Sequence, residues 1–123
     1  MVPEEARRLY QAGLEAASSG DLHEAFELIE NAVQVHPDYA EACKTLARLS
    51  MDTNEIRAFQ NWCHEAARID PRDPEPYWML GELLAGQRRR EEAVEALERA
   101  LALCDSGDGI RPRVQDLLER IRR

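Results

Sequence analysis

The feature that most constrains this chain is a period of 34 residues, which occurs three times in succession without an insertion. Small and apolar residues take the same places in each period, and a proline closes the first two at Pro37 and Pro71, with Asp105 at the third such position. A period of roughly 20–50 residues indicates an array of stacked supersecondary units. The matched residues are Leu9, Ala12, Gly13, Ala16, Ala25, Ile29 and Ala32; then Cys43, Leu46, Ala47, Ser50, Phe59, Cys63 and Ala66; then Tyr77, Leu80, Gly81, Leu84, Ala93, Leu97 and Ala100.

The pattern resembles the tetratricopeptide repeat (TPR), a helix-turn-helix unit marked by an aromatic residue, Leu-Gly, a second aromatic, Ala, Phe and a final Pro at these spacings. The resemblance covers residues 6 to 107. The chain departs from the family at Leu9 and Cys43, which replace a frequent Trp, and at Phe59, which replaces a small residue between the two helices. The resemblance implies an all-α fold, a right-handed superhelix of three helix-turn-helix repeats.

The residues themselves also predict helices. Each period holds two segments of roughly a dozen residues with apolar positions at helical spacing, separated by polar turns. Asp21 and Asp38 are expected to accept backbone N–H groups at helix starts, and Asp73 precedes a start that is rich in proline. Gly13, Ala47 and Gly81 fall where two helices must approach closely. We therefore expect a single domain, 1–123, with repeats at 6–39, 40–73 and 74–107.

Residues 108–123 leave the period but keep a helical pattern. Five apolar residues share one face of this segment, with charged residues opposite. The last unit of a repeat array has an open apolar face, which a terminal amphipathic helix covers. The sequence thus predicts a capping helix at about 110–123 and seven helices in all. The apolar residues are Ile110, Val114, Leu117, Leu118 and Ile121.

Charge and composition exclude several classes of function. The formal net charge is −8, from 24 acidic and 16 basic side chains, which disfavours nucleic-acid binding because that depends on neutralising phosphates. The N-terminal residues lack the basic and hydrophobic regions of a secretory signal, and the apolar stretches are helix faces interrupted by charge. We expect a cytoplasmic protein with no membrane partner. The Arg88-Arg89-Arg90 run is expected to be a solvated turn.

No residue pattern predicts catalysis, a cofactor or a metal. Cys43 and Cys63 occupy packed pattern positions and are interpreted as buried small hydrophobes, with a disulfide between them disfavoured. Cys63 and His64 are adjacent on a helix and point about 100° apart, too far for a catalytic dyad. His23 and His36 sit at expected helix ends as solvated residues. The chain is therefore not expected to be an enzyme.

The resemblance implies that function lies in the groove lined by the first helix of each repeat. Residues one step off the packed pattern on these helices should face a partner, and they combine aromatic anchors with both charges. We expect a partner peptide or helix with apolar and acidic side chains. The predicted binding residues are Tyr10, Leu14, Lys44, Thr45, Arg48, Trp78, Met79 and Glu82.

Each tryptophan has two interpretations. Trp78 either packs against Tyr77 or a neighbouring helix, or turns away from the core because Tyr77 already holds the packed aromatic position. Exposed tryptophan is enriched at binding hot spots, which favours the second interpretation. Trp62, on a second helix, either covers Phe59 or marks a second contact surface on the convex side, and we favour the former.

Two classes of function remain. The leading one is an adaptor that holds a partner peptide, and the alternative is an assembly module that self-associates or forms part of a longer repeat protein. Three-repeat chaperones of bacterial secretion systems match in size only. Binding of acidic chaperone tails is disfavoured because the family's clamp of cations and amides is missing. Its positions hold Tyr10, Leu14, Thr45, Glu75 and Met79.

Overall fold

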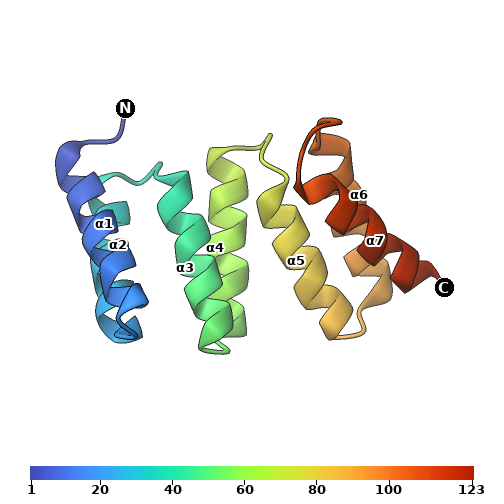
Figure 1. Ribbon diagram of the computed structural model, residues 1–123, viewed down its shortest axis with the longest axis horizontal. Helices are drawn as coiled ribbons and strands as arrows, with labels where there is room; N and C mark the ends of the chain where they lie inside the picture. Colours follow the sequence, from blue (N-terminus) through green and yellow to red (C-terminus); the bar gives the residue numbers. More distant parts are fainter. The chain divides into compact units, whose positions relative to one another are not determined.

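A computed structural model describes residues 1–123, which form seven α-helices and no strand (Figure 1). The number and type of elements confirm the all-α, seven-helix prediction. The chain divides into two compact units, unit 1 (Met1–Ile69) and unit 2 (Asp70–Arg123). The helices are α1 (Glu4–Ser18), α2 (Leu22–Val35), α3 (Ala40–Asp52) and α4 (Ile56–Ile69) in unit 1, then α5 (Glu75–Gly86), α6 (Arg90–Leu103) and α7 (Ile110–Arg122) in unit 2.

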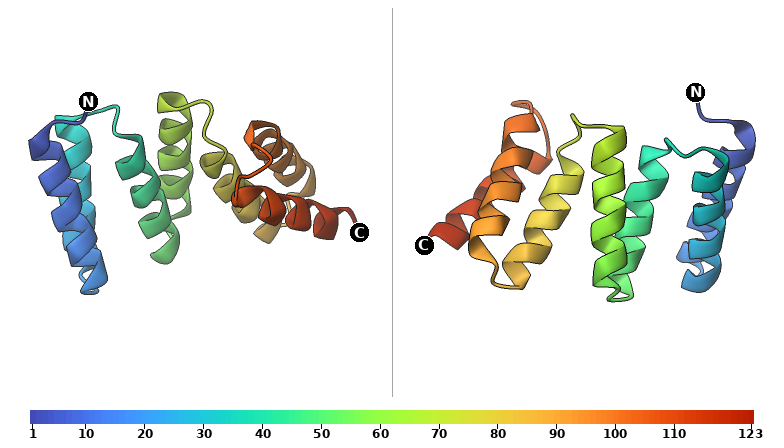
Figure 2. Two further views of the ribbon diagram at one scale, coloured as in Figure 1. Left: turned by 45° about the horizontal axis from the view of Figure 1, so that its top comes forward. Right: turned by 180° about the vertical axis from the view of Figure 1, so that it is seen from behind.

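Unit 1 consists of two antiparallel helix pairs. Helix α1 packs on α2, α3 packs on α4, and α2 also contacts α3. Its core gathers the periodic residues, among them Ile29 and Leu46, which are fully buried. Helices α1 and α3 lie toward the viewer in Figure 1, and α2 and α4 do so in the right-hand view of Figure 2. Unit 1 therefore has one face made by first helices and one made by second helices.

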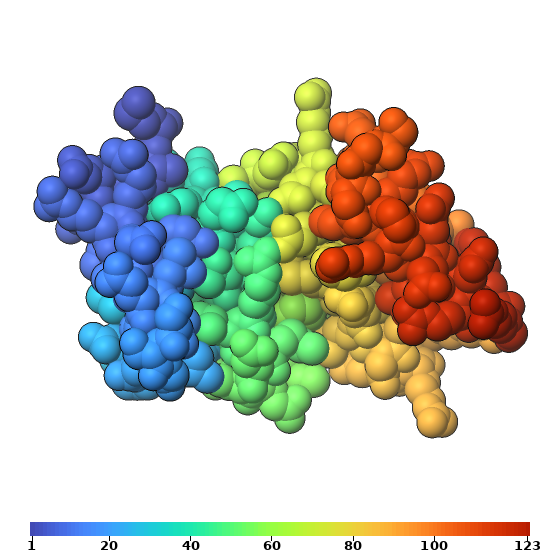
Figure 3. Space-filling view, viewed as in Figure 1, coloured from blue at the N-terminus to red at the C-terminus, as the bar shows by residue number.

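Unit 2 is a helix pair covered by a third helix. Helices α5 and α6 pack on each other, and α7 packs on both. Val114 and Leu118 of α7 are buried against Leu97 and Ala100 of α6. In the space-filling view the side chains of α7, in red, cover much of α6 on this face (Figure 3). The predicted amphipathic helix at the C-terminus thus buries its apolar face on the preceding pair.

The two repeat glycines sit at close helix contacts, as predicted. A Cβ on Gly13 of α1 would overlap Ile29 Cγ1 of α2, and a Cβ on Gly81 of α5 would lie 2.5 Å from Leu97 Cδ2 of α6. Both facing side chains are fully buried and have little room to move. Glycine at these positions therefore allows each helix pair to pack at close range.

The helix starts agree with the sequence at two of three places. Asp21 Oδ1 accepts the backbone N–H of Glu24 at 3.1 Å, and Asp73 Oδ1 accepts that of Glu75 at 3.0 Å. The prediction for Asp38 was wrong. Helix α3 begins at Ala40 after Tyr39, one residue too late for that carboxylate to cap it, and Asp38 instead lies 3.5 Å from the guanidinium of Arg68.

The arginine run begins in the turn between α5 and α6 and ends at Arg90, the first residue of α6. Arg88 adopts a left-handed backbone conformation with φ of 62°, and its N–H donates to the carbonyl of Ala85 at 3.1 Å. This geometry ends helix α5. Arg89 pairs with Glu92 at 2.7 Å, and all three arginines are exposed, in agreement with a solvated turn. None of the seven helices is both long and apolar enough to span a membrane.

Candidate partner-binding surfaces

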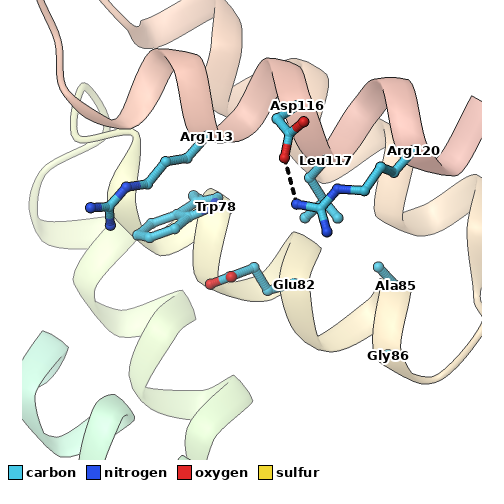
Figure 4. Close-up of a pocket in the computed structure, with 8 residues that line it drawn as sticks. All are labelled: Trp78, Glu82, Ala85, Gly86, Arg113, Asp116, Leu117 and Arg120. Carbon is cyan, nitrogen blue, oxygen red and sulfur yellow. Dashed lines mark hydrogen bonds and ion pairs between the residues drawn. The ribbon is translucent and has the colours of Figure 1, made fainter.

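Unit 2 contains a hollow of about 590 Å³ between α5 and α7 (Figure 4). Helix α5 contributes an aromatic ring, a carboxylate and two small residues, and α7 contributes two guanidinium groups, a carboxylate and a leucine. Apolar and charged surface thus alternate around one depression. The lining residues are Trp78, Glu82, Ala85, Gly86, Arg113, Asp116, Leu117 and Arg120.

Trp78 forms one wall of this hollow. Its indole is half-buried and packs against the core shared by α6 and α7. The guanidinium carbon of Arg113 lies 5.7 Å from the ring centroid, within the range of a cation–π interaction. Arg113 makes no ion pair. The indole therefore packs partly into unit 2 and keeps part of its surface in the hollow, so each of its two interpretations is correct in part.

The other charged groups of the hollow differ in how they are compensated. Arg120 donates to Asp116 Oδ2 at 2.6 Å, one helical turn away on α7 (Figure 4). Although part of the Glu82 side chain reaches solvent, desolvation raises the pKa of its carboxyl, and the positive charge of Arg113 opposes that rise. The hollow thus holds one internally neutralised pair, and beside it a cation on an aromatic face and an exposed carboxylate with a raised pKa.

The first helices of unit 1 bring two predicted residues into contact with each other. The hydroxyls of Tyr10 on α1 and Thr45 on α3 are 2.8 Å apart and share a hydrogen bond, and Thr45 Oγ1 lies 3.0 Å from the carbonyl of Glu41. The Tyr10 ring also meets Tyr39 edge to face, with centroids 5.1 Å apart. These contacts join the two helix pairs of unit 1 and engage both polar groups.

Lys44 is buried although its sequence position predicted exposure. Only 8% of its side chain is accessible, and its Nζ lies 3.0 Å from Glu41 Oε1. Thr45 and Met79 are also buried, which leaves little of either surface for a partner. The expectation that all eight predicted residues are open to a partner is therefore wrong for these three. Of the others in unit 1, Leu14 is half-buried and Arg48 is exposed.

The sequence placed all eight predicted residues in one groove, whereas the structure divides them among different contacts. Trp78 and Glu82 line one hollow, whereas Tyr10 and Thr45 bond to each other. Sequence reasoning missed the α7 side of the hollow. The charged side of the amphipathic α7 was visible as a pattern, but which of its side chains approach α5 depends on how the helix packs. The missed residues are Arg113, Asp116, Leu117 and Arg120.

The three cysteines are buried free thiols. Burial raises the pKa of Cys43 to about 11 and that of Cys63 to about 12, and it also raises the pKa of Cys104. A nucleophilic or metal-binding cysteine needs a lowered pKa, since the thiolate is the reactive form. These thiols therefore act as small buried residues, as the sequence predicted for Cys43 and Cys63.

Known protein families and structures agree with this fold. Two sequence models described as tetratricopeptide repeat match the chain, one over residues 16–64 and the other over residues 74–106. Among solved structures, the Yersinia enterocolitica type III secretion chaperone SycD in complex with a peptide of the translocator YopD is 17% identical. The match covers 98% of this chain and 94% of that chain, with a TM-score of 0.88. The similarity to secretion chaperones thus extends from size to fold.

Two further structures are similar over nearly the whole chain. The first TPR of Spaghetti (RPAP3), bound to the HSP90 peptide SRMEEVD, is 18% identical over 97% of this chain and 91% of that one, with a TM-score of 0.82. The N-terminal domain of stress-induced protein-1 (STI-1) from C. elegans is 14% identical over 96% and 94%, with a TM-score of 0.83. The two sequence matches, the 34-residue period and the paired helices together show that this chain belongs to the tetratricopeptide repeat family.

Proposed function

We propose that this protein is an interaction adaptor that binds a partner peptide or helix through its first helices, with the α5–α7 hollow as the main anchor. The observation that carries the proposal is the combination of a half-buried tryptophan, an apolar floor at Leu117 and a cation without an ion pair at Arg113, all around one hollow. Hot spots of protein interfaces are enriched in tryptophan and arginine and lie in such depressions. SycD and RPAP3, which share the fold, are each described in complex with a peptide.

The hollow favours a partner that presents an apolar side chain next to an acidic one. The apolar group would lie against Trp78 and Leu117, and its burial would provide most of the affinity. A carboxylate would approach Arg113, because Arg120 is already paired with Asp116. Glu82, whose raised pKa reflects partial desolvation, disfavours a second acidic group deeper in the hollow. This fits an adaptor, which binds without transforming its partner, better than an enzyme.

The exposed first-helix residues of unit 1 are proposed as a secondary contact. Arg48 supplies an exposed guanidinium, and Leu14 supplies a half-buried apolar side chain. Tyr10, Lys44 and Thr45 have internal partners, so they position this surface rather than anchor a ligand. Met79 contributes through its packing. The three buried free thiols are compatible with a reducing compartment, and we propose the cytoplasm.

The test compares capture of partners by the wild-type protein and by hollow variants. Tagged Trp78→Ala and Arg113→Gln proteins are incubated with lysate of the source organism, and bound proteins are quantified by mass spectrometry. A partner of the hollow is expected to lose about thirtyfold in affinity with Trp78→Ala, since such a hot spot contributes about 2 kcal/mol. Arg123→Gln removes one arginine outside the hollow and serves as the charge control.

The folded state of each variant is checked by circular dichroism, because Trp78 also packs against the unit 2 core. If Trp78→Ala keeps its helicity and still captures every wild-type partner, the hollow is not the anchor. Equal losses with Arg113→Gln and Arg123→Gln would mean that general charge, rather than the site, attracts the partner.

An assembly role is the second candidate. A SycD structure with this fold is described as an alternative dimer, and α6 and α7 form a shallow hollow with Leu101 and Leu118 on its lining. Self-association through that face would appear as a concentration-dependent mass in sedimentation experiments. A constant monomer mass over the accessible concentration range would exclude it.

A further inference from the structure

A second hollow lies in unit 1, on the face made by the second helices of the repeats rather than the first helices. It has a volume of about 350 Å³ and lies between α2 and the start of α4. Within unit 1, helices α2 and α4 are those nearer the viewer in the right-hand view of Figure 2. The proposed adaptor function does not use this surface. Its lining residues are His23, Phe26, Glu27, Glu30, Glu55, Ala58 and Trp62.

The rings of this hollow are anchored in the core. Phe26 and Trp62 are half-buried and pack against the core of unit 1, so their positions are fixed while part of each ring remains accessible. Trp62 comes from α4 and Phe26 from α2. The hollow therefore has aromatic surface from both helices before any ligand arrives, which lowers the entropic cost of binding.

The rim of the hollow is acidic. Three glutamates line it, and no lysine or arginine does. Glu27 lies 3.2 Å from His23 Nε2, whereas Glu30 and Glu55 form no ion pair. Exposed carboxylates alone would be an ordinary solvated surface. Here they surround fixed aromatic rings, and a cation on an aromatic face close to carboxylates gains from both interactions.

We infer that the α2–α4 hollow binds an arginine side chain presented by a basic segment of a partner protein. A guanidinium is planar and weakly hydrated, so it can stack on Trp62 while its edge donates to Glu30 or Glu55, whereas the ammonium group of lysine is compact and strongly hydrated. A second copy of this chain is the wrong occupant by charge. Residues 1–69 carry 12 acidic and 6 basic side chains, and the whole chain has a formal charge of −8, so a basic partner complements this surface better than a second acidic copy does.

The test uses the fluorescence of Trp62 in a Trp78→Phe background, in which Trp62 is the only tryptophan. The probe is a blocked Gly/Ser peptide that carries arginines, compared with the same peptide carrying neutral citrulline or lysine. The arginine peptide is expected to change the Trp62 emission and bind at low salt, the citrulline peptide is expected not to bind, and the lysine peptide should bind more weakly. Equal binding of arginine and citrulline peptides would overturn the inference.

Matched variants separate the site from general attraction. Glu27→Gln with Glu30→Gln should weaken binding of the arginine peptide about tenfold, since two exposed charge interactions are lost. Glu5→Gln with Glu15→Gln changes the net charge equally on α1, outside the hollow, and should leave affinity nearly unchanged. Equal weakening in the two pairs would mean that the peptide follows overall charge, and the inference would fail.

Two further outcomes would also overturn the inference. One is binding that survives Trp62→Leu at full strength, measured by calorimetry since this variant lacks the fluorescent reporter, because leucine keeps apolar packing but removes the aromatic face. The other is a dimer mass at high protein concentration without peptide that Glu27→Gln with Glu30→Gln abolishes, since it would identify a second copy as the occupant. Circular dichroism of each variant verifies that unit 1 remains folded.

Discussion

Equivalent positions of the first helices behave differently in the two units. Tyr10, Lys44 and Trp78 stand 34 residues apart at the same place in successive repeats. In unit 1, Tyr10 bonds to Thr45 and Lys44 is buried against Glu41, so both polar groups are used internally. In unit 2, Trp78 lines a hollow beneath Arg113. The same register thus gives internal contacts in one unit and the lining of a hollow in the other.

The difference follows from what packs beside each first helix. Helices α1 and α3 both belong to unit 1, and the hydroxyls of Tyr10 and Thr45 join them by a hydrogen bond. Helix α5 in unit 2 meets α7, which lies outside the repeat pattern and contributes long arginines rather than matching polar groups. Because the side chains of α7 do not pair with those of α5 as Thr45 pairs with Tyr10, a hollow remains between these two helices. The capping helix therefore also builds the candidate site.

The largest expected effect comes from removing that neighbour. A chain ending at Gly107 lacks α7 and exposes the apolar surface that Val114 and Leu118 cover, each worth roughly 1.5–3 kcal/mol of gross burial. We expect self-association and binding of a hydrophobic dye, measured by light scattering and fluorescence. If the truncated chain remains monomeric and does not bind the dye, α7 is not a cap.

The next largest effect is on stability and comes from substituting the glycines at the close helix contacts. The loss of unfolding free energy should be similar in the two units. Gly13→Ala and Gly81→Ala should each lower the free energy of unfolding by about 1–3 kcal/mol, because the added methyl group overlaps Ile29 or Leu97. Chemical denaturation measures this. Gly86→Ala meets open space and should be neutral or stabilising by up to about 1 kcal/mol. A Gly13 variant as stable as the Gly86 variant would show that the α1–α2 contact relaxes easily.

A smaller effect tests the internal contacts of unit 1. Tyr10→Phe removes the hydroxyl that bonds to Thr45 and should cost about 0.5–1.5 kcal/mol of unfolding free energy. Thr45→Val removes the other partner. If the two groups interact, the double variant loses less than the sum of the single variants, as measured by a double-mutant cycle. Strict additivity would contradict the idea that unit 1 engages these residues internally.

The smallest effect concerns the pH dependence of unit 2. Desolvation raises the pKa of Glu82 in the folded protein, so the folded state binds more protons than the unfolded state between the ordinary glutamate pKa and the raised one. The contribution of Glu82 to stability is therefore full below that window and falls as pH rises through it. Glu82→Gln should flatten this part of the stability-versus-pH curve. An unchanged curve would mean that water solvates the carboxylate as well in the folded state as in the unfolded one.

The periodic pattern by itself determined the helices, their order and the residues that pack them. Residues such as Gly13, Gly81, Ile29 and Leu97 recur at fixed spacing because a helix pair repeats its contacts every 34 residues. Local chemistry sets the start of α2 at Asp21, which caps its own helix. These features depend on nearby residues and on one repeated geometry, so a linear pattern records them.

The tertiary structure alone decided which positions line a hollow. Register predicted that Lys44, Thr45 and Met79 would face outward, yet all three are buried, because burial depends on neighbouring elements that the repeat pattern does not encode. Arg113 and Leu117 joined Trp78 only through the packing of α7 on α5. Hollows lie between elements that are distant in sequence, and their lining depends on side-chain lengths and on the packing of the helices. For that reason the sequence determined the helices, and the tertiary structure determined the candidate site.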